Sequence, residues 1–289
     1  MLVGLIGANI QKSLSPALHE DALAAAGIHG HYHLMDLDRL PGRGLADLLS
    51  AARTAGFAGV NITYPCKQSV VSLLDAVSSE ARQTGAVNTV TIAGDGSTKG
   101  YNTDRVGFQR AFEETLGSDA ASGQTVLLVG AGGAGRAVAH ALLDVGVQTL
   151  LINDKDLEQA SRLTADLISH FGPGRARIEF EPKAAVSKSS GVVNATPVGM
   201  LGIPGNPIPV DAIAPYHWVA DVIYTPLETE LVKVARAKGA KVMGGAGMCV
   251  HQAAETFRLF TGLSPDVHRM HRVFAEAAAI RDRNLAELG

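Results

Sequence analysis

The chain has 289 residues, of which 46% are hydrophobic and 18% are charged, and its formal net charge is −3 at pH 7. This length is enough for two domains with full cores, and the small negative charge gives no reason to expect a nucleic acid partner. No apolar stretch approaches the roughly 20 residues that a membrane-spanning helix needs. The only cysteines are Cys66 and Cys249, which predicts no disulfide framework and no metal site, and is typical of a reducing, cytoplasmic compartment.

In the first half of the chain, short apolar runs alternate with helical patterns. Ser15 is expected to cap the first helix, with Pro16 in its first turn. The last two strands are expected to form a hairpin. We expect helices at about 16–26, 44–55, 67–74 and 103–116, and strands at 2–6, 31–35, 59–63, 86–92 and 98–101.

The second half follows a small polar linker at 117–123. We expect strands at 126–129, 150–152, about 178–180, 191–194, 218–222 and 241–243, and helices at about 136–145, 157–171, 228–238, 250–260 and 267–285. Strand–helix alternation predicts an α/β fold with mostly parallel sheets. We expect a substrate-binding and catalytic domain at 1–103, completed by helices at about 250–289, and a Rossmann-type doubly wound dinucleotide-binding domain at 104–249.

A glycine-rich turn follows the apolar run at 126–129. Gly130, Gly132 and Gly135 fit the G-x-G-x-x-G pattern. The first glycine permits a tight turn, the second lets the backbone approach a pyrophosphate, and the third lets helix and strand pack closely. The helix N-terminus then offers free N–H groups to phosphates. Asp154 lies 24 residues after Gly130, near the spacing expected for an acid that binds ribose hydroxyls, so this segment predicts dinucleotide binding.

Polar clusters follow the predicted strands of the first half, where open α/β sheets place their ligands. Hydroxyls, carboxamides, one lysine and one aspartate make up a set suited to a polyhydroxylated small molecule. Taken alone, Asn61 and Asn88 are better explained as turn residues and Asp104 as a helix cap. The clusters are Ser13-Leu14-Ser15-Pro16, Asn61-Ile62-Thr63-Tyr64-Pro65-Cys66-Lys67, Asn88-Thr89 and Asn102-Thr103-Asp104.

At these residues the chain resembles the shikimate dehydrogenase family. The matching segments follow one another in the family's order over nearly the whole chain. They are Lys12-Ser13-Leu14-Ser15-Pro16 with His19, Asn61-Ile62-Thr63 with Pro65 and Lys67, Gly85-Ala86-Val87-Asn88-Thr89, Gly100-Tyr101-Asn102-Thr103-Asp104, Gly130–Gly135, Asn194-Ala195-Thr196-Pro197, and Gly244-Gly245 with Met248 and Gln252.

The resemblance implies interconversion of a 3-hydroxyl and a 3-ketone on a cyclic carboxylate such as shikimate or quinate. It implies that Lys67 and Asp104 are the catalytic pair, and the chemistry agrees, because a hydroxyl proton must leave as hydride departs. Ser13 and Ser15 would bind the substrate carboxylate, and Tyr224 would lie near it. The residues expected to bond the ring hydroxyls are Asn61, Thr63, Asn88 and Gln252.

The predicted cofactor is NAD. Biosynthetic family members end the second cofactor strand with Asn-Arg-Thr or similar, and that arginine pairs with the 2′-phosphate of NADP. Here Asp154 stands in the arginine's place, as in the NAD-dependent quinate/shikimate dehydrogenase branch, and a carboxylate repels a 2′-phosphate. Lys155 could neutralise part of a phosphate's charge. The residues expected to bind the cofactor are Gly130, Ala131, Gly132, Gly133, Ala134, Gly135, Asn153, Asp154, Lys155, Thr196, Gly245 and Met248.

Two other functions remain open at this point. One is a paralogue acting on a related ring such as aminoshikimate, whose pocket would look nearly the same. The other is a non-catalytic NAD-binding regulator, against which the retention of Lys67 and Asp104 argues. His19 and His251 are expected to pack or cap, and Cys66 to be a buried small residue. The oligomeric state stays open, with a homodimer among the options.

Overall fold

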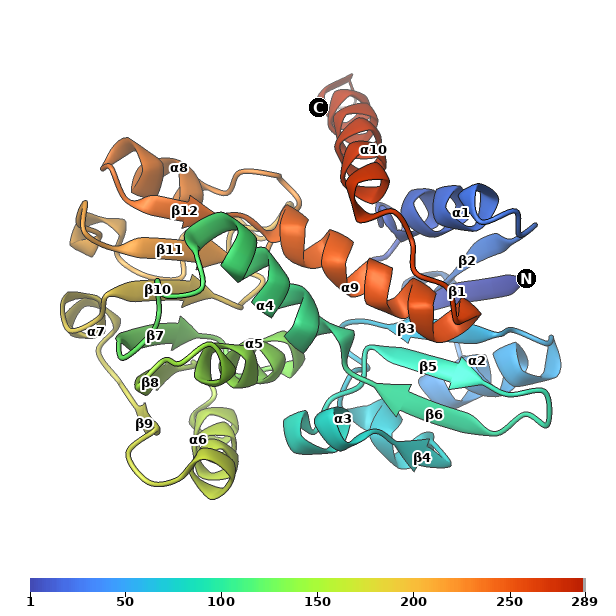
Figure 1. The fold of residues 1–289 in the computed structure, drawn as a ribbon, viewed down its shortest axis with the longest axis horizontal. Coiled ribbons are helices and arrows are strands. Elements are labelled where there is room, and N and C mark those ends of the chain that lie inside the picture. The colour runs from blue at the N-terminus through green and yellow to red at the C-terminus, as the bar shows by residue number, and fades with distance from the viewer. Residues whose placement is uncertain (288–289) are drawn as a thin grey trace. The chain divides into compact units, whose positions relative to one another are not determined.

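The computed structural model describes residues 1–287, and the chain divides into two compact units (Figure 1). The first unit comprises Met1–Thr103 and the chain from Val250 onward, and the second comprises Asp104–Cys249. Within residues 1–287, no helix is both long enough and apolar enough to cross a membrane.

The first unit is built on a six-stranded mixed sheet. Its strand order is β2-β1-β3-β5-β6-β4, in which β5 runs antiparallel to β3 and β6 and the other pairings are parallel. The strands are β1 (Leu2–Gly7), β2 (His31–Asp36), β3 (Gly59–Ile62), β4 (Ala76–Val77), β5 (Thr89–Ile92) and β6 (Thr98–Tyr101). The helices are α1 (Ser15–Ala25), α2 (Leu45–Thr54), α3 (Ser79–Thr84), α9 (Gly245–Thr261), which begins within the second unit, and α10 (Val267–Glu287), with short 3₁₀ helices η1 (Leu37–Arg39) and η2 (Ser69–Leu73).

Both faces of this sheet are buried, because successive strand residues point to opposite sides. On one face, Ile6 and Val60 pack with residues of α2 and η2. On the other face, Val3 and Leu5 pack with residues of α1 and with Phe257 of α9. The expected strands and the hairpin of β5 and β6 are present. The sheet of the first unit is therefore covered by helices on both faces.

Two local predictions in this unit were wrong, and two short elements were not predicted. The helix expected at 67–74 is a turn followed by η2, in which the hydroxyls of Ser69 and Ser72 donate to the carbonyls of Cys66 and Ser69. Such local bonds compete with α-helical ones. The N-cap of α1 is Leu14 rather than Ser15, so Ser15 is the first helical residue. The short elements β4 and α3 lie where no element was expected.

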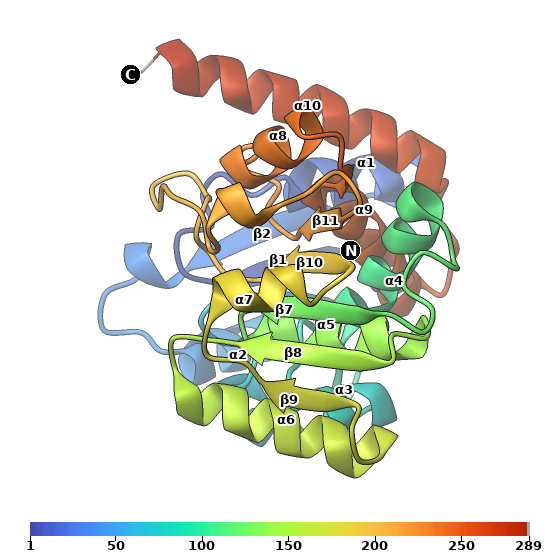
Figure 2. The same cartoon turned by 90° about the vertical axis from the view of Figure 1, so that its left-hand side faces the viewer.

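The second unit is a doubly wound parallel sheet. Its strand order is β12-β11-β10-β7-β8-β9, and all the pairings are parallel. Figure 2 shows β7, β8 and β9 side by side, with α6 packed along β8 and β9. The elements are α4 (Thr103–Leu116), β7 (Thr125–Val129), α5 (Gly133–Asp144), β8 (Thr149–Asn153), α6 (Leu157–Phe171), β9 (Ala176–Ile178), α7 (Pro182–Ser187), β10 (Gly191–Asn194), η3 (Val210–Ala212), β11 (Trp218–Asp221), α8 (Glu230–Ala237) and β12 (Lys241–Met243).

Alternation along β7 separates the two cores of this unit. Val126 and Leu128 pack with residues of α4, α5 and α6, whereas Leu127 and Val129 pack with residues of α7 and α8. This order places the topological switch point between β7 and β10, and open α/β sheets bind ligands outside the strand ends at such a point.

Trp218, the only tryptophan of the chain, is buried in the second unit. A methyl group at Gly191 on the neighbouring strand would lie 2.1 Å from the indole ring, so only glycine fits beneath it. The ring of Phe112 meets the indole edge-on, with 5.0 Å between the ring centroids. The indole therefore fills the space between β10 and α4.

Candidate active site

The sheet register of the first unit brings its predicted polar residues to one edge. Asn61 at the end of β3 pairs with Thr89 of β5, and Thr89 pairs with Tyr101 of β6. These three strands lie side by side (Figure 1). Because β5 is antiparallel to its neighbours, its start lies at the edge where β3 and β6 end. Asn88 and Thr103 therefore follow at the same edge as Asn61.

Two carboxamides are fixed within this cluster by hydrogen bonds. Asn61 Oδ1 accepts from the Tyr32 hydroxyl at 2.8 Å, and Asn61 Nδ2 donates to Thr89 Oγ1 at 3.0 Å. Asn88 Oδ1 accepts from the backbone N–H of Thr103 at 2.8 Å, and Asn88 Nδ2 donates to Thr103 Oγ1 at 2.9 Å. Both asparagines are buried and hydrogen-bonded at both ends of the amide, so they belong to an ordered polar cluster rather than to a turn.

Helix α9 contributes two further side chains to the cluster. Gln252 Oε1 accepts from Thr103 Oγ1 at 3.4 Å. Thr256 lies one helical turn later, on the same face, and its hydroxyl is 2.9 Å from that of Thr89 and 3.2 Å from that of Thr103. Sequence analysis identified Gln252 but missed Tyr32 and Thr256, because neither stands beside a recognisable motif.

The loop after β1 carries the two serines expected to bind a carboxylate. Ser13 and Ser15 are partly exposed, and Ser13 Oγ accepts from the backbone N–H of Ser15 at 3.2 Å. The carboxylate of Asp36 at the end of β2 accepts from the backbone N–H of Ile10 at 3.3 Å and from Gln11 Nε2 at 3.0 Å. Asp36 therefore holds this loop in place, a role that the sequence did not reveal.

Thr63 and Lys67 follow β3 in a turn. The backbone N–H of Thr63 donates to the carbonyl of Ile6, and the carbonyl of Lys67 accepts from the N–H of Val87 at 2.8 Å. The Lys67 side chain is half-buried. Burial raises the pKa of the neighbouring Cys66 thiol, which opposes a role for that cysteine as a nucleophile.

Asp104 stands in the first turn of α4 and is buried. It directly follows Thr103, whose backbone and side chain are both held by Asn88. The polar cluster therefore fixes the start of the helix that carries this carboxylate.

In the second unit, the three motif glycines have three different surroundings. Gly130 has φ +105°, a conformation that favours glycine, and its N–H donates to the carbonyl of Asn153. A methyl group at Gly135 would lie 1.9 Å from the carbonyl oxygen of Gly130. At Gly132 a methyl group would meet nothing within 4 Å. The turn thus leaves open space beside Gly132, where a pyrophosphate would have to approach.

The second cofactor strand, β8, ends beside this turn. Asp154 Oδ2 accepts from the backbone N–H of Ala131 at 2.6 Å, and its Oδ1 accepts from the N–H of Asp156 at 2.8 Å. Asn153 Nδ2 donates to the carbonyl of Glu179, while the Lys155 side chain is exposed. The structure therefore brings Asp154 and the glycine turn together. Gly133 and Ala134 form the first turn of α5.

A buried aspartate at the end of β11 supports the loop that follows β10. Asp221 accepts from Asn194 Nδ2 at 3.1 Å, from the N–H of Ile223 at 3.0 Å and from the Thr229 hydroxyl at 2.7 Å. Asn194 Oδ1 in turn accepts from the N–H of Thr196 at 2.9 Å. Desolvation raises the pKa of Asp221. Sequence analysis singled out Thr196 but not the aspartate that supports its loop.

The remaining predicted residues of this unit lie near the end of β11 and the start of α9. Tyr224 follows β11 and is partly buried. A methyl group at Gly245 would lie 2.3 Å from the carbonyl oxygen of Val222, so close packing requires glycine there. Met248 is buried in the core formed by α4, α5 and α6.

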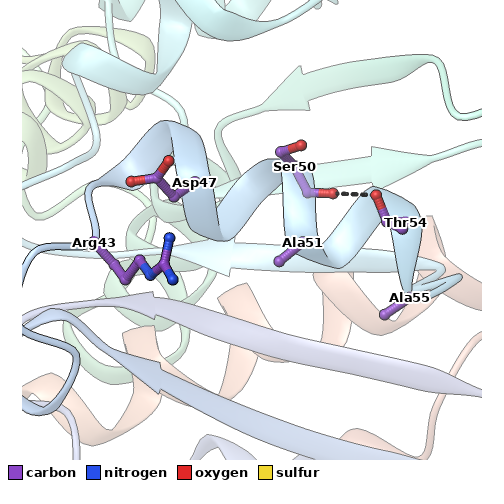
Figure 3. A pocket seen from close by; sticks show the side chains of 6 residues that line it. All are labelled: Arg43, Asp47, Ser50, Ala51, Thr54 and Ala55. Carbon is purple, nitrogen blue, oxygen red and sulfur yellow. Dashed lines mark hydrogen bonds between the residues drawn. The ribbon is translucent and has the colours of Figure 1, made fainter.

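A surface pocket outside these clusters runs along α2. Figure 3 shows it between Arg43 in the preceding loop and Ala55 at the helix end. None of the six residues that line it belongs to the predicted site. The chemistry-bearing residues lie at the strand ends instead, so we do not take this pocket for the active site.

Comparison with known proteins identifies the family. Two family models match the chain: the shikimate dehydrogenase substrate binding domain at residues 5–90 and the shikimate 5′-dehydrogenase C-terminal domain at residues 245–273. A quinate/shikimate dehydrogenase (NAD(+)) of Corynebacterium efficiens is 48% identical over 95% of this chain and 97% of its own length. A shikimate dehydrogenase (NADP(+)) of Streptomyces avermitilis is also 48% identical, over 96% of each chain.

A solved structure agrees with these relatives. Quinate dehydrogenase from Corynebacterium glutamicum in complex with NAD superposes with a TM-score of 0.89 at 45% identity, covering 96% of this chain and 99% of that one. The two-unit α/β architecture predicted from the sequence is confirmed by this similarity. With sequence relatives at this identity along almost its entire length, the chain belongs to the shikimate dehydrogenase family of oxidoreductases.

Proposed function

We propose that this protein is an NAD-preferring dehydrogenase that interconverts shikimate and 3-dehydroshikimate, and also quinate and 3-dehydroquinate. The observation that carries the proposal is the side-by-side polar edge of β3, β5 and β6, which offers hydroxyls and carboxamides to a hydroxylated ring. The substrate and cofactor named for the similar proteins support it.

In the proposed reaction, the C3 carbinol carbon of the ring loses a hydride and its hydroxyl loses a proton. Bound NAD would supply the hydride acceptor. Lys67 takes the hydroxyl proton as the C–H bond breaks, and Asp104 steadies the resulting ammonium. In the reverse direction C3 regains the hydride while Lys67 returns the proton to the forming alkoxide, and the two together reduce the carbonyl to the alcohol.

Substrate binding is assigned to polar residues that follow the strands. Ser13 and Ser15 donate to the substrate carboxylate, and Tyr224 lies near it in the proposed complex. Hydrogen bonds to a charged acceptor are the stronger kind, which suits a carboxylate as the anchoring group. The residues assigned to the ring hydroxyls are Thr63, Asn88 and Gln252, with Asn61 in the same polar cluster.

Cofactor binding is assigned to the strand ends of the second unit. The open space at Gly132 suits a pyrophosphate, whose charge the N-terminus of α5 favours. Asn153, Asp154 and Lys155 would surround the adenosine ribose. Thr196, Gly245 and Met248 would contact the nicotinamide end.

The preference for NAD rests on Asp154. The two relatives at 48% identity carry different cofactors in their names, so overall similarity does not decide between them. The position of the Asp154 carboxylate at the Ala131 N–H puts a negative charge beside the phosphate-binding turn. That charge accepts hydrogen bonds from free ribose hydroxyls and repels a 2′-phosphate.

Two finer assignments accompany this function. We propose a cytoplasmic location, supported by the buried cysteines Cys66 and Cys249, neither of which forms a disulfide, as suits a reducing compartment. The second assignment is a homodimer, which analytical ultracentrifugation would detect as a mass near twice 30.0 kDa.

The test is a cofactor reduction assay with purified protein. Shikimate, quinate and aminoshikimate are each offered with NAD and with NADP, and kcat/KM is measured for every pair. The proposal expects the highest value with NAD and either shikimate or quinate. Activity with aminoshikimate alone would identify a paralogue, and NAD binding without turnover would identify a regulator.

A further inference from the structure

A network of buried hydrogen bonds crosses the first unit from β2 to α9. The Tyr32 hydroxyl donates to Asn61 Oδ1, and Asn61 Nδ2 donates to Thr89 Oγ1. Thr89 Oγ1 donates to Asn88 Oδ1 at 3.1 Å. Asn88 Nδ2 donates to Thr103 Oγ1, and the single proton of that hydroxyl is within reach of Asn88 Oδ1 at 3.2 Å, Thr256 Oγ1 at 3.2 Å and Gln252 Oε1 at 3.4 Å.

Backbone groups fix the two amide orientations. A carboxamide has a donor end and an acceptor end, and the backbone carbonyl of Asn88 accepts from Asn61 Nδ2 at 3.1 Å, so the Asn61 oxygen faces the Tyr32 hydroxyl. The backbone N–H of Thr103 donates to Asn88 Oδ1 at 2.8 Å and orients the Asn88 carboxamide. The Tyr32 hydroxyl therefore completes the bonding of Asn61, which itself contacts the carbonyl of Asn88 and the hydroxyl of Thr89.

Thr256 closes this network from α9. Its hydroxyl lies 2.9 Å from Thr89 Oγ1, 3.2 Å from Thr103 Oγ1 and 3.3 Å from Asn61 Nδ2, and the residue is fully buried. The Thr256 hydroxyl shares the two protons of Asn61 Nδ2 with the Asn88 carbonyl and the Thr89 hydroxyl, and its own proton is within reach of the hydroxyls of Thr89 and Thr103. Valine has the shape of threonine but lacks the hydroxyl, so that replacement would leave the network short of one donor and one acceptor.

Tyr32 is anchored at the other end by packing. It is 2% exposed, and its ring stacks on that of His19 with 4.8 Å between centroids and 16° between planes. Burial lowers the pKa of His19 to about 3, so this histidine is neutral and acts as a flat packing surface. The stack holds the tyrosine hydroxyl at Asn61.

We infer that Tyr32 and Thr256 are positioning residues of the substrate site, and that Asn61 acts through Asn88 and Thr89 rather than by touching the ring. Both polar ends of the Asn61 carboxamide already bond to buried neighbours. Tyr32 and Thr256 hold that carboxamide in place, and the carboxamide holds the carbonyl of Asn88 and the hydroxyl of Thr89, which donates to Asn88 Oδ1. This inference rests on the proposed function, because the side chain that is positioned, Asn88, is the one assigned there to the ring hydroxyls.

The experiment is a double-mutant cycle on the full chain with shikimate and NAD. Tyr32→Phe removes only the hydroxyl, and we expect kcat/KM for shikimate to fall about 5- to 30-fold, as for loss of one buried hydrogen-bond partner. Thr256→Val should give a similar loss, and Thr256→Ser should restore most of it. The KM for NAD should stay within about twofold. Matched controls are Thr91→Val on β5 and Tyr216→Phe in the second unit, which lie outside the network.

Coupling separates positioning from general stability. In an Asn61→Ala background, Tyr32→Phe should cause less than about a twofold further loss, because the group it holds in place is gone. Additive losses in that background, or a Tyr32→Phe variant within about twofold of wild type, would overturn the inference while leaving an active dehydrogenase. A wild-type protein without shikimate or quinate oxidation would instead overturn the proposed function. If Thr256→Val does not fold, the Tyr32 and Asn61 variants still complete the test.

Discussion

The carboxylate of Asp154 accepts a hydrogen bond from the backbone N–H of Ala131, with 2.6 Å between Oδ2 and N. This bond ties the residue that we expect to select the cofactor to the turn that we expect to bind its pyrophosphate. The carboxylate is therefore held rather than free to swing away from a 2′-phosphate. A substitution at this position changes both a charge and a contact of the glycine turn.

The first prediction concerns cofactor choice. A carboxylate about 4 Å from a 2′-phosphate is opposed by roughly 1–4 kcal/mol in a partly solvated site. We expect kcat/KM to favour NAD over NADP by at least about tenfold, with the exposed Lys155 offsetting part of the repulsion. Asp154→Arg should shift the ratio toward NADP, and Asp154→Asn, which keeps an acceptor for the Ala131 N–H, should shift it less. Equal use of both cofactors by the wild type would show that Asp154 is not the discriminator.

The second prediction concerns the proton acceptor. Lys67→Ala removes the group assigned to acid/base catalysis, so kcat should fall about 10²–10⁴-fold while the KM for substrate changes less. Lys233→Ala, on the exposed side of α8, is the matched control and should leave kcat unchanged. Retention of more than about a third of wild-type kcat by Lys67→Ala would end the assignment.

The third prediction concerns the substrate carboxylate. Replacing Ser13 and Ser15 together by alanine should weaken shikimate binding by roughly 1–3 kcal/mol, because hydrogen bonds to a charged group are lost. NAD affinity, measured by titration calorimetry, should not change. The Ser50→Ala variant on α2 serves as a control, since Ser50 is exposed and belongs to no assigned site. Parallel losses for both ligands would point to a folding defect instead.

The fourth prediction contrasts two glycines of the same turn. Gly132→Ala places a methyl group in open space at φ −70°, so the melting temperature should hardly change, but the dissociation constant for NAD should rise at least about tenfold. Gly135→Ala places its methyl group against the carbonyl oxygen of Gly130, and overpacking of this kind costs roughly 1–3 kcal/mol of unfolding free energy. Equal effects of the two variants on stability and on NAD binding would contradict the division of roles.

The fifth prediction concerns the pH dependence of stability. Desolvation raises the pKa of Asp221 above its ordinary value of 3.8. The folded state therefore holds the proton more tightly than the unfolded chain does, and this group's contribution to stability falls as pH rises from 3.8 through the raised pKa. Asp221→Asn removes the titration, so wild type should gain in melting temperature relative to the variant as pH is lowered. Calorimetry at several pH values measures this difference, and a constant difference would refute the raised pKa.

Much of the fold was readable because the relevant signals are local. Apolar runs bounded by glycine or polar residues gave β7, β8, β10 and β11, and the glycine turn gave the start of α5. The hairpin of β5 and β6 could be predicted from the turn residues Gly94-Asp95-Gly96 between the two strands. The site residues that stand in compact motifs, such as Ser13 and Lys67, could also be named in advance, and their catalytic and binding roles remain predictions.

What could not be read depends on contacts between residues far apart in the sequence. Thr256 bonds to Asn61 across 195 positions, and no local pattern marks a threonine in the middle of a helix as a partner of a strand end. The sequence marks Asp221 only as part of a buried strand, because its three hydrogen-bond donors, in Asn194, Ile223 and Thr229, are recognisable only in the folded structure. The expected helix at 67–74 failed because serine hydroxyls there bond to nearby carbonyls instead.

The single tryptophan gives this protein a built-in optical reporter. Trp218 lies wholly in the second unit, packed over Gly191 and against Phe112, and the chain has no other indole. Emission excited selectively from indole therefore follows the melting of the Rossmann-type sheet alone, whereas circular dichroism follows the helices of both units. Comparing the two signals in one titration asks directly whether the halves of the chain melt as one cooperative system.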